Sequence, residues 1–287
     1  MRSDFLRIAG ITIAVRCEDE RVLCEWSGAT RRFLVPPATP DVDLTLRAAD
    51  SIAPSEGEVV FDSGAVWRML RDGNGFRIEC TSDAFERNPY KVATFNADFT
   101  RGEVLLTPPV LHLSPLDYPL DEVLVAQLLG RGRGVELHSA GIIDHAGRGH
   151  LFVGMSGAGK STTARLWGAA AAGIVSDDRV IVREQEDGAM WMHGTPWHGE
   201  AELSMAASAP LAGVYLLVQS PVNAIRSLPH AAAVARLFTC TFPLFSNAGA
   251  LEFTLAFLER LAGRVPVREL CFTRDASVVE LIRTEAA

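Results

Sequence analysis

The stretch Gly154-Met155-Ser156-Gly157-Ala158-Gly159-Lys160-Ser161 matches the pattern GxxxxGK[ST] at every fixed position. It follows the apolar run at residues 149–153, which predicts a strand, and opens an alanine-rich run at about residues 160–172, which predicts a helix. A strand, a glycine loop and a helix in this order are the context in which the pattern binds the phosphates of a nucleoside triphosphate. The alternative is a Gly/Ser-rich turn between strand and helix that matches the pattern by chance and binds no nucleotide.

Each part of this loop has a predicted role. Its glycines let the backbone turn tightly and aim N–H groups at phosphate oxygens, and the helix that follows presents the positive end of its dipole. Lys160 adds a full charge at the β- and γ-phosphates, and the Ser161 hydroxyl is placed to bind Mg²⁺. ATP and Mg²⁺ are therefore the predicted cofactors. The predicted nucleotide-binding residues are Gly154, Ser156, Gly157, Ala158, Gly159, Lys160, Ser161 and Thr162.

Two adjacent acids, Asp177 and Asp178, follow a short predicted strand at residues 174–176. Adjacent side chains at a strand end point in different directions. One carboxylate can serve Mg²⁺, directly or through water, while the other accepts the proton of the phosphate acceptor. The alternative is a solvated turn of the kind that Asp favours.

His138 lies on the hairpin that precedes the loop, at the centre of an apolar segment. It could reach the γ-phosphate or orient an acid. From the residues alone, a hydrogen-bonded core histidine is the favoured interpretation.

The rest of the chain predicts two domains, 1–117 and 118–287. The first is β-rich, with a strand over residues 8–15 and an antiparallel meander over 58–80 whose turns carry Gly and Asn. Proline-rich segments at 107–109 and 114–119 are the linker candidates. In the second domain strands alternate with helices and with hairpins, which predicts an α/β fold with a mixed sheet.

Composition excludes several classes of protein. The net charge of -8 and the pI of about 5.4 argue against a nucleic-acid partner. No apolar run approaches the roughly 18–20 residues that span a bilayer, so no membrane partner is predicted. The cysteines are Cys17, Cys24, Cys80, Cys240 and Cys271. Being five and scattered, they predict small buried side chains in a reducing cytoplasm rather than disulfides or a zinc site.

The order His138, hairpin, GMSGAGKS, helix and Val175-Ser176-Asp177-Asp178 resembles the HPr serine kinase/phosphorylase family and, more loosely, ATP-dependent phosphoenolpyruvate carboxykinase. The resemblance covers roughly residues 118–287 and is strongest over 135–183. It implies a mixed-sheet P-loop kinase domain preceded by a β-rich N-terminal domain.

The resemblance implies that Lys160 binds phosphate and that Ser161 holds the metal together with either Asp177 or Asp178. The other of the two acids then acts as the base. The resemblance also makes His138 a site residue. Because HPr kinases assemble into hexamers, it implies a homo-oligomer. The longer glycine-containing signature that bacterial HPr kinases carry after their acids is absent, so the acceptor is open between a peptide, a protein serine and a small molecule.

In place of that signature stands His193-Gly194-Thr195-Pro196-Trp197-His198-Gly199-Glu200. Thr195 and Trp197 are the predicted substrate-side residues, and His198 and Glu200 could touch the metal. A structural turn with Trp197 packed on the core is an equal alternative. Phosphoryl transfer also uses positive charge, and the candidates for it are Arg179, Arg226 and Arg236.

The predicted function is an ATP-dependent kinase that acts on a hydroxyl acceptor. Two alternatives use the same site. One is a regulatory or assembly protein that binds or slowly hydrolyses ATP, and the other is a phosphorylase or phosphatase. A motor of the ABC type and a GTPase are disfavoured, because neither an LSGGQ-like signature nor an NKxD sequence follows the loop.

Overall fold

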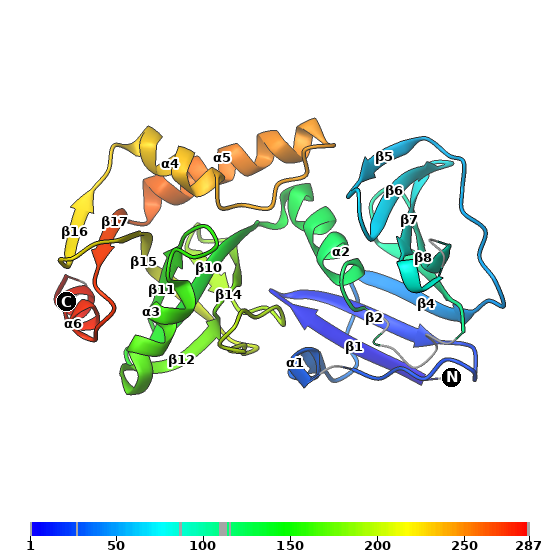
Figure 1. Ribbon diagram of the computed structural model, residues 1–287, viewed down its shortest axis with the longest axis horizontal. Coiled ribbons are helices and arrows are strands. Elements are labelled where there is room, and N and C mark those ends of the chain that lie inside the picture. Colours follow the sequence, from blue (N-terminus) through cyan, green and yellow to red (C-terminus); the bar gives the residue numbers. More distant parts are fainter. Residues whose placement is uncertain (1, 27, 86–87, 109–113, 115, 286–287) are drawn as a thin grey trace. The chain divides into compact units, whose positions relative to one another are not determined.

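The computed structural model describes residues 2–26, 28–85, 88–108, 114 and 116–285. The chain divides into two compact units, Met1–Leu128 and Leu129–Ala287 (Figure 1). The predicted boundary at 117/118 falls before helix α2 (Leu120–Leu128). The division between the two units falls after this helix, between Leu128 and Leu129. One contact that ties α2 to the first unit joins Gln127 Nε2 to Met69 Sδ at 3.9 Å. Pro109 and Pro115 of the predicted linkers lie outside the described residues.

Within the described residues, the first unit is built on a nine-stranded sheet with the order β3-β1-β2-β4-β9-β8-β7-β6-β5. The strands are β1 (Arg2–Ile8), β2 (Ile11–Cys17), β3 (Leu34–Val35), β4 (Val42–Ala48), β5 (Val59–Asp62), β6 (Trp67–Asp72), β7 (Gly75–Thr81), β8 (Pro89–Phe95) and β9 (Arg101–Leu106), and helix α1 is Gly28–Arg31. Strand β4 pairs in parallel with β2 and β9. The predicted antiparallel meander is confirmed, since β5, β6 and β7 pair in succession.

The prediction of one strand over residues 8–15 is wrong. The chain turns at Ala9 (φ 49°) and Gly10 (φ 75°), and Ile8 pairs with Ile11 across the hairpin of β1 and β2. A two-residue hairpin turn of this kind needs positive φ at both central residues. The β-branched residues on either side marked strand correctly, but they concealed the turn.

The second unit is built on a mixed sheet, as predicted. Its eight strands, counted over the described residues, have the order β11-β10-β13-β14-β15-β17-β16, and β12 lies beside β10. They are β10 (Val135–Asp144), β11 (Gly149–Val153), β12 (Ala171–Ser176), β13 (Arg179–Glu184), β14 (Met190–His193), β15 (Ser208–Gln219), β16 (Ala224–Ser227) and β17 (Val267–Phe272). Strand β15 pairs in parallel with β11 and β17, and the other pairs are antiparallel.

Helices cover both faces of this sheet (Figure 1). They are α3 (Lys160–Trp167), α4 (His230–Phe238), α5 (Ala248–Arg264) and α6 (Ser277–Glu285). Along β11, Leu151 and Val153 join the core under α4 and α5, while Phe152 joins the core under α3 and α6. Because successive side chains of a strand point to opposite faces, a strand covered on both sides is apolar throughout. The glycine loop leaves this buried strand.

The helix predicted over residues 160–172 is shorter than expected. Helix α3 ends at Trp167, a 3-10 turn follows at Gly168–Ala170, and the remaining alanines begin β12. Gly168 adopts φ 39° at this point, and β12 then pairs with β10. Pairing with a neighbouring strand overrides the helical preference of alanine here.

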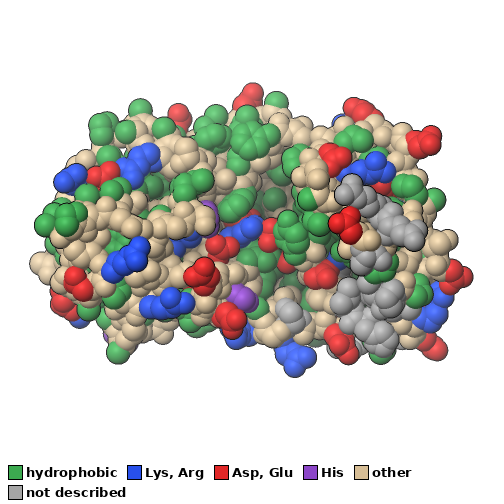
Figure 2. All heavy atoms as spheres, viewed as in Figure 1, with side chains coloured by type: hydrophobic (Ala, Val, Ile, Leu, Met, Phe, Trp, Pro, Cys, Tyr) green, Lys and Arg blue, Asp and Glu red, His purple; other side chains and the backbone are tan. Residues whose placement is uncertain are grey.

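The five cysteines are all buried and free, which confirms the prediction that they are small core side chains. On the face drawn in Figure 2, acidic and basic side chains of the described residues are interspersed rather than separated by sign. Within the described part of the chain, no helix has the length and apolar character needed to cross a membrane.

Candidate functional site

The glycine loop joins β11 to α3, so the predicted strand–loop–helix context is confirmed. The N–H of Gly154 donates to the carbonyl of His138 (3.2 Å), and the N–H of Ala158 donates to the carbonyl of Met155 (3.1 Å). The loop therefore starts against β10, the strand that carries His138. Residues 155–157 are exposed. Their backbone is open to a ligand at the end of the sheet.

Two glycines of the loop are required by close contacts. A methyl group on Gly154 would lie 2.6 Å from Ala158 Cβ, and one on Gly159 would lie 2.6 Å from Phe272 Cζ. Gly159 also has φ 108°, a conformation that L-residues rarely adopt. Glycine at these positions is thus explained by the fold of the loop itself, independently of any ligand.

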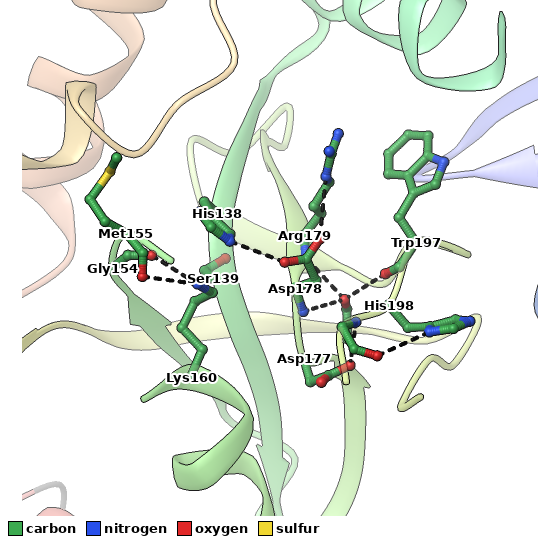
Figure 3. A network of polar contacts seen from close by, with 12 residues as sticks. His138, Ser139, Gly154, Met155, Lys160, Asp177, Asp178, Arg179, Trp197 and His198 are labelled. Carbon is green, nitrogen blue, oxygen red and sulfur yellow. Dashed lines mark hydrogen bonds and ion pairs between the residues drawn. The ribbon is translucent and has the colours of Figure 1, made fainter. Parts of the chain in front are cut away.

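Lys160 is the first residue of α3, and its side chain folds back over the loop. Its Nζ donates to the carbonyls of Gly154 (3.0 Å) and Met155 (3.2 Å), and the residue is 6% exposed (Figure 3). Burial lowers the pKa of this amine, and the charges of Asp178, Cys240 and Asp177 oppose that effect. The amine therefore lies against the backbone of the loop, and its role in binding phosphate stays a prediction.

Asp178 and His138 form a hydrogen-bonded pair beside this loop (Figure 3). His138 Nε2 lies 3.0 Å from Asp178 Oδ1, and the backbone N–H of Ser139 donates to the Asp178 carbonyl (2.8 Å). The hydrogen bond from His138 lowers the pKa of Asp178 against the effect of burial, and the charges of His138, Arg179 and Lys160 lower it further. Asp178 is therefore an ionised carboxylate whose orientation is fixed by His138.

Asp177 points the other way, as expected for adjacent residues at a strand end. It is 1% exposed, and its carboxylate accepts three backbone N–H groups. Gly199 (2.9 Å) and Leu203 (3.3 Å) donate to Oδ1, and Ala201 (3.0 Å) donates to Oδ2. Asp177 thus anchors the segment 199–203, a role that the sequence did not suggest.

Ser176 and Thr195 attach the neighbouring segment to the same turn. Ser176 Oγ donates to the carbonyl of Trp197 (2.9 Å), and Thr195 Oγ1 donates to the carbonyl of Arg179 (2.6 Å). Thr195 is fully buried. We therefore assign it to the framework of the site and not to the acceptor. The side chain of Trp197 projects away from Asp177 in Figure 3, and its substrate-side role stays a prediction.

The three arginines considered from the sequence all have protein partners. Arg226 and Arg236 pair with Glu269 at 3.5 and 2.6 Å. Arg179 lies 3.4 Å from Asp178 Oδ2 and 4.3 Å above the ring of Phe242. Arg226 and Arg236 are thus held by structural ion pairs, and only Arg179 contacts the Asp178–His138 pair.

Two side chains that form hydrogen bonds at the loop were not predicted from the sequence. Gln219 Nε2 donates to the carbonyl of Gly157 (2.8 Å), and the guanidinium of Arg274 donates to Gln219 Oε1 (3.3 Å). Gln219 ends β15, and Arg274 follows β17. The usable signal would have been their position after two apolar strands, since parallel strands of one sheet end at the same edge.

The two histidines of the segment 193–200 differ in environment. Burial, assisted by the charge of Arg183, lowers the pKa of His193 to about 4. His198 is exposed, with Nδ1 3.2 Å from the carbonyl of Gly199. The carbonyl of Glu200 accepts from Arg165 (3.4 Å). Metal contacts of His198 and Glu200 stay predictions.

Oxygen atoms suited to Mg²⁺ lie around Gly199. A methyl group there would be 2.9 Å from Asp177 Oδ2 and 3.4 Å from Ser161 Oγ, so the two side chains flank it. A carboxylate offers about four lone-pair directions, of which the three amides use three. The described residues contain no group of three or more His, Cys, Asp or Glu that could hold a metal. Magnesium bound with a triphosphate needs only one or two protein ligands, because phosphate and water complete its shell. Ser161 and Asp177 fit that requirement.

The first unit contains a cavity of about 320 Å³ lined in part by Trp67, Arg68 and Glu79. Glu79 is buried but paired with Arg68 and Arg77, each at 2.8 Å. Burial raises the pKa of Glu79, and the hydrogen bonds from these arginines outweigh that effect and lower it. Because this carboxylate is ionised and fully paired, we assign the cavity no chemistry.

No protein-family model matches the chain, and a search of curated proteins finds no match.

Proposed function

We propose that this chain is an ATP- and Mg²⁺-dependent kinase that transfers the γ-phosphate to a hydroxyl group of a peptide, a protein serine or a small molecule. One observation carries the proposal. His138, on the strand that accepts the first hydrogen bond of a complete GxxxxGKS loop, lies 3.0 Å from the carboxylate of Asp178 in the turn before β13. A protein that only bound ATP would need the loop but not an oriented carboxylate beside it.

On the donor side, the exposed backbone of residues 155–157 and the start of α3 bind the phosphates through N–H groups. Lys160 exchanges its bonds to the carbonyls of Gly154 and Met155 for bonds to phosphate oxygens. Ser161 and Asp177 would hold Mg²⁺, which supplies charge neutralisation at the β- and γ-phosphates.

On the acceptor side, Asp178 accepts the proton of the hydroxyl group while His138 holds its carboxylate in place. The hydroxyl oxygen forms a bond to the γ-phosphorus as the bond between that phosphorus and the bridging oxygen of ADP breaks. ADP leaves with the electron pair of the broken bond. The products are a phosphate monoester, ADP and a protonated Asp178, which returns its proton to water.

A chemical label tests the donor side. An acyl-phosphate derivative of ATP acylates an amine beside its terminal phosphate, and the chain has two lysines, Lys91 and Lys160. Lys91 is buried in an ion pair with Asp117. We expect acylation of Lys160 that excess ATP prevents, detected by peptide mass spectrometry. Absence of the Lys160 label, or a label that ATP does not displace, would contradict the proposal.

Transfer is tested with γ-labelled ATP, Mg²⁺ and candidate acceptors that include the products of neighbouring genes. The Asp178→Asn variant should lose roughly 10²- to 10⁴-fold in rate, because general-base catalysis contributes that much, and should keep its ATP affinity. Hydrolysis of ATP without label on any acceptor would favour the regulatory protein. Release of phosphate from a phosphorylated acceptor would favour the phosphorylase or phosphatase.

The Asp177→Asn variant separates the two acids. Its amide group would place a donor against backbone N–H donors of segment 199–203. We expect its free energy of unfolding to fall by about 1–3 kcal/mol, the cost of an unsatisfied buried group, and we expect a smaller fall in Asp178→Asn, which loses only the charge of the pair with His138. Chemical denaturation measures both. Equal stability of the two variants would show that the anchoring role of Asp177 is wrong.

A further inference from the structure

The glycine loop has neighbours on both sides along the edge of the sheet. Strand β11, which leads into the loop, pairs in parallel with β15, and β15 pairs in parallel with β17, with Gln219 opposite Phe272. The carboxyl ends of these three strands therefore lie at one edge. In α/β sheets, ligands bind at this edge. The residues that follow β15 and β17 are thus placed to contact whatever the loop binds.

Gln219 and Arg274 extend from those two strand ends to the loop. Gln219 Nε2 donates to the carbonyl of Gly157 (2.8 Å), which fixes the peptide of a glycine with φ 80°. Gln219 Oε1 in turn accepts from Arg274 (3.3 Å). One guanidinium N–H is used in this way, and four others remain on a planar fork. Both side chains are exposed.

The turn that carries Arg274 is held by its own hydrogen bonds. Asn223 Oδ1 accepts from the N–H of Thr273 (2.7 Å), and Thr273 Oγ1, with its single proton, lies 3.0 Å from Asn223 Oδ1 and 2.6 Å from Asp275 Oδ2. Within the described residues, Arg274 forms no ion pair with a carboxylate. It therefore differs from Arg226 and Arg236, which both form ion pairs with Glu269.

The two sides of the loop are chemically different. His138 and Asp178 belong to β10 and to the turn before β13, on one side of β11, whereas β15 and β17 lie on the other side. In the proposed reaction the γ-phosphate lies beside Asp178. A triphosphate that runs along the loop from Asp178 then directs its α-phosphate and nucleoside towards Gln219 and Arg274.

We propose that Gln219 and Arg274 form the nucleoside end of the ATP site, with the Arg274 guanidinium bound to the α-phosphate and Gln219 holding Gly157 in its binding conformation. This inference rests on the proposed function. A guanidinium suits the task because its parallel N–H groups match two phosphate oxygens, and such charge-assisted bonds are among the stronger ones. Lys160 acts at the opposite end, on the β- and γ-phosphates.

The test uses the full chain and compares ATP with ADP, since both contain the α-phosphate and only ATP contains the γ-phosphate. Titration of the wild type, Arg274→Ala and Lys160→Ala with fluorescent ATP and ADP derivatives gives the affinities. We expect Arg274→Ala to weaken both ligands by the same factor, about tenfold for a lost charge-assisted bond. Lys160→Ala should weaken ATP more than ADP. Arg274→Lys should keep part of the affinity for both, as it retains the charge without the fork.

Arg283→Ala is the matched control, because Arg283 is an exposed arginine of the same C-terminal segment, paired with Glu280 at 3.1 Å. It should bind both nucleotides like the wild type. If the wild type binds neither nucleotide, the proposed function fails and this inference falls with it. If the wild type binds both and Arg274→Ala binds equally well, the inference alone is overturned. A loss confined to ATP would overturn the α-phosphate assignment.

Discussion

Asp177 and Asp178 are identical neighbours that the fold puts to different uses. Asp178 faces the imidazole of His138, and Asp177 faces the backbone of residues 199–203. A carboxylate whose side-chain partners are an imidazole and, at 3.4 Å, the guanidinium of Arg179 can still take up a proton from a substrate. One that accepts three amides is committed to the protein, with one lone pair left for a metal or water. We therefore propose Asp178 as the base and Asp177 as the residue on the magnesium side.

The environment of Asp178 predicts a pH effect. Because the hydrogen bond from His138 is the largest cause of its lowered pKa, His138→Ala should raise that pKa. The base must be ionised, so the acidic limb of kcat/KM for transfer should move to higher pH in this variant. A pH–rate profile measures the shift. His145→Ala is the control, since His145 bonds the carbonyl of Ala169 and does not contact the acids. An unmoved acidic limb in His138→Ala would show that Asp178 is not the titrating base.

The same interaction affects stability. The pKa of Asp178 is lowered from its ordinary value of 3.8. Its contribution to the free energy of unfolding is therefore complete above pH 3.8 and is lost as the pH falls through the lower folded value. At neutral pH the His138–Asp178 pair consequently supports both the fold and the proposed chemistry.

At the scale of elements, the glycine loop depends on β17 as well as on β11 and α3. The ring of Phe272, at the end of β17, lies against Gly159 so closely that a methyl group there would meet it at 2.6 Å. Gly157, by contrast, has φ 80° but no atom within 4 Å of a methyl position. One glycine is therefore required by backbone conformation and packing together, and the other by conformation alone.

This difference predicts unequal costs. Gly159→Ala should lower the free energy of unfolding by roughly 2–4 kcal/mol, because left-handed strain adds to overpacking against Phe272. Gly157→Ala should cost about 1–2 kcal/mol from the strain alone. Chemical denaturation gives both values, and Phe272→Leu should recover part of the Gly159→Ala loss. Equal costs for the two alanine variants would exclude a role for the Phe272 contact.

At the scale of the whole molecule, the candidate site lies within a single unit. The glycine loop, His138, both acids, Gln219 and Arg274 all belong to Leu129–Ala287, which has its own sheet and its own hydrophobic cores. The first unit has a separate nine-stranded sheet over its described residues. The donor side of the proposed reaction therefore requires no residue from the first unit.

A fragment of residues 129–287 should accordingly bind ATP with an affinity close to that of the full chain. Circular dichroism establishes whether the fragment folds, and calorimetric titration measures the affinity. Lys160→Ala in the fragment is the control and should weaken binding. A folded fragment that fails to bind ATP would contradict the assignment of the whole nucleotide site to this unit.

Much of the second unit was predictable because its signals are local. Glycine spacing predicted the loop between β11 and α3, and the hairpins predicted for this domain include the one formed by β13 and β14. Prediction of secondary structure failed where a partner distant in the sequence determines whether a segment forms a helix or a strand. Alanines after Trp167 joined β12 because β10 offered hydrogen bonds. Helices α4 and α6 were missed although their segments carry helical patterns of their own.

The sequence by itself determined the loop and the composition of the site, since backbone conformation at glycine and the chemistry of Lys160 and Ser161 are properties of contiguous residues. Only the tertiary structure decided which side chains meet. His138 reaches Asp178 across 40 residues, and Gln219 reaches Gly157 across 62. These contacts follow from strand order and register, which are set by the packing of both faces of the sheet. A shift of one residue would turn His138 to the opposite face.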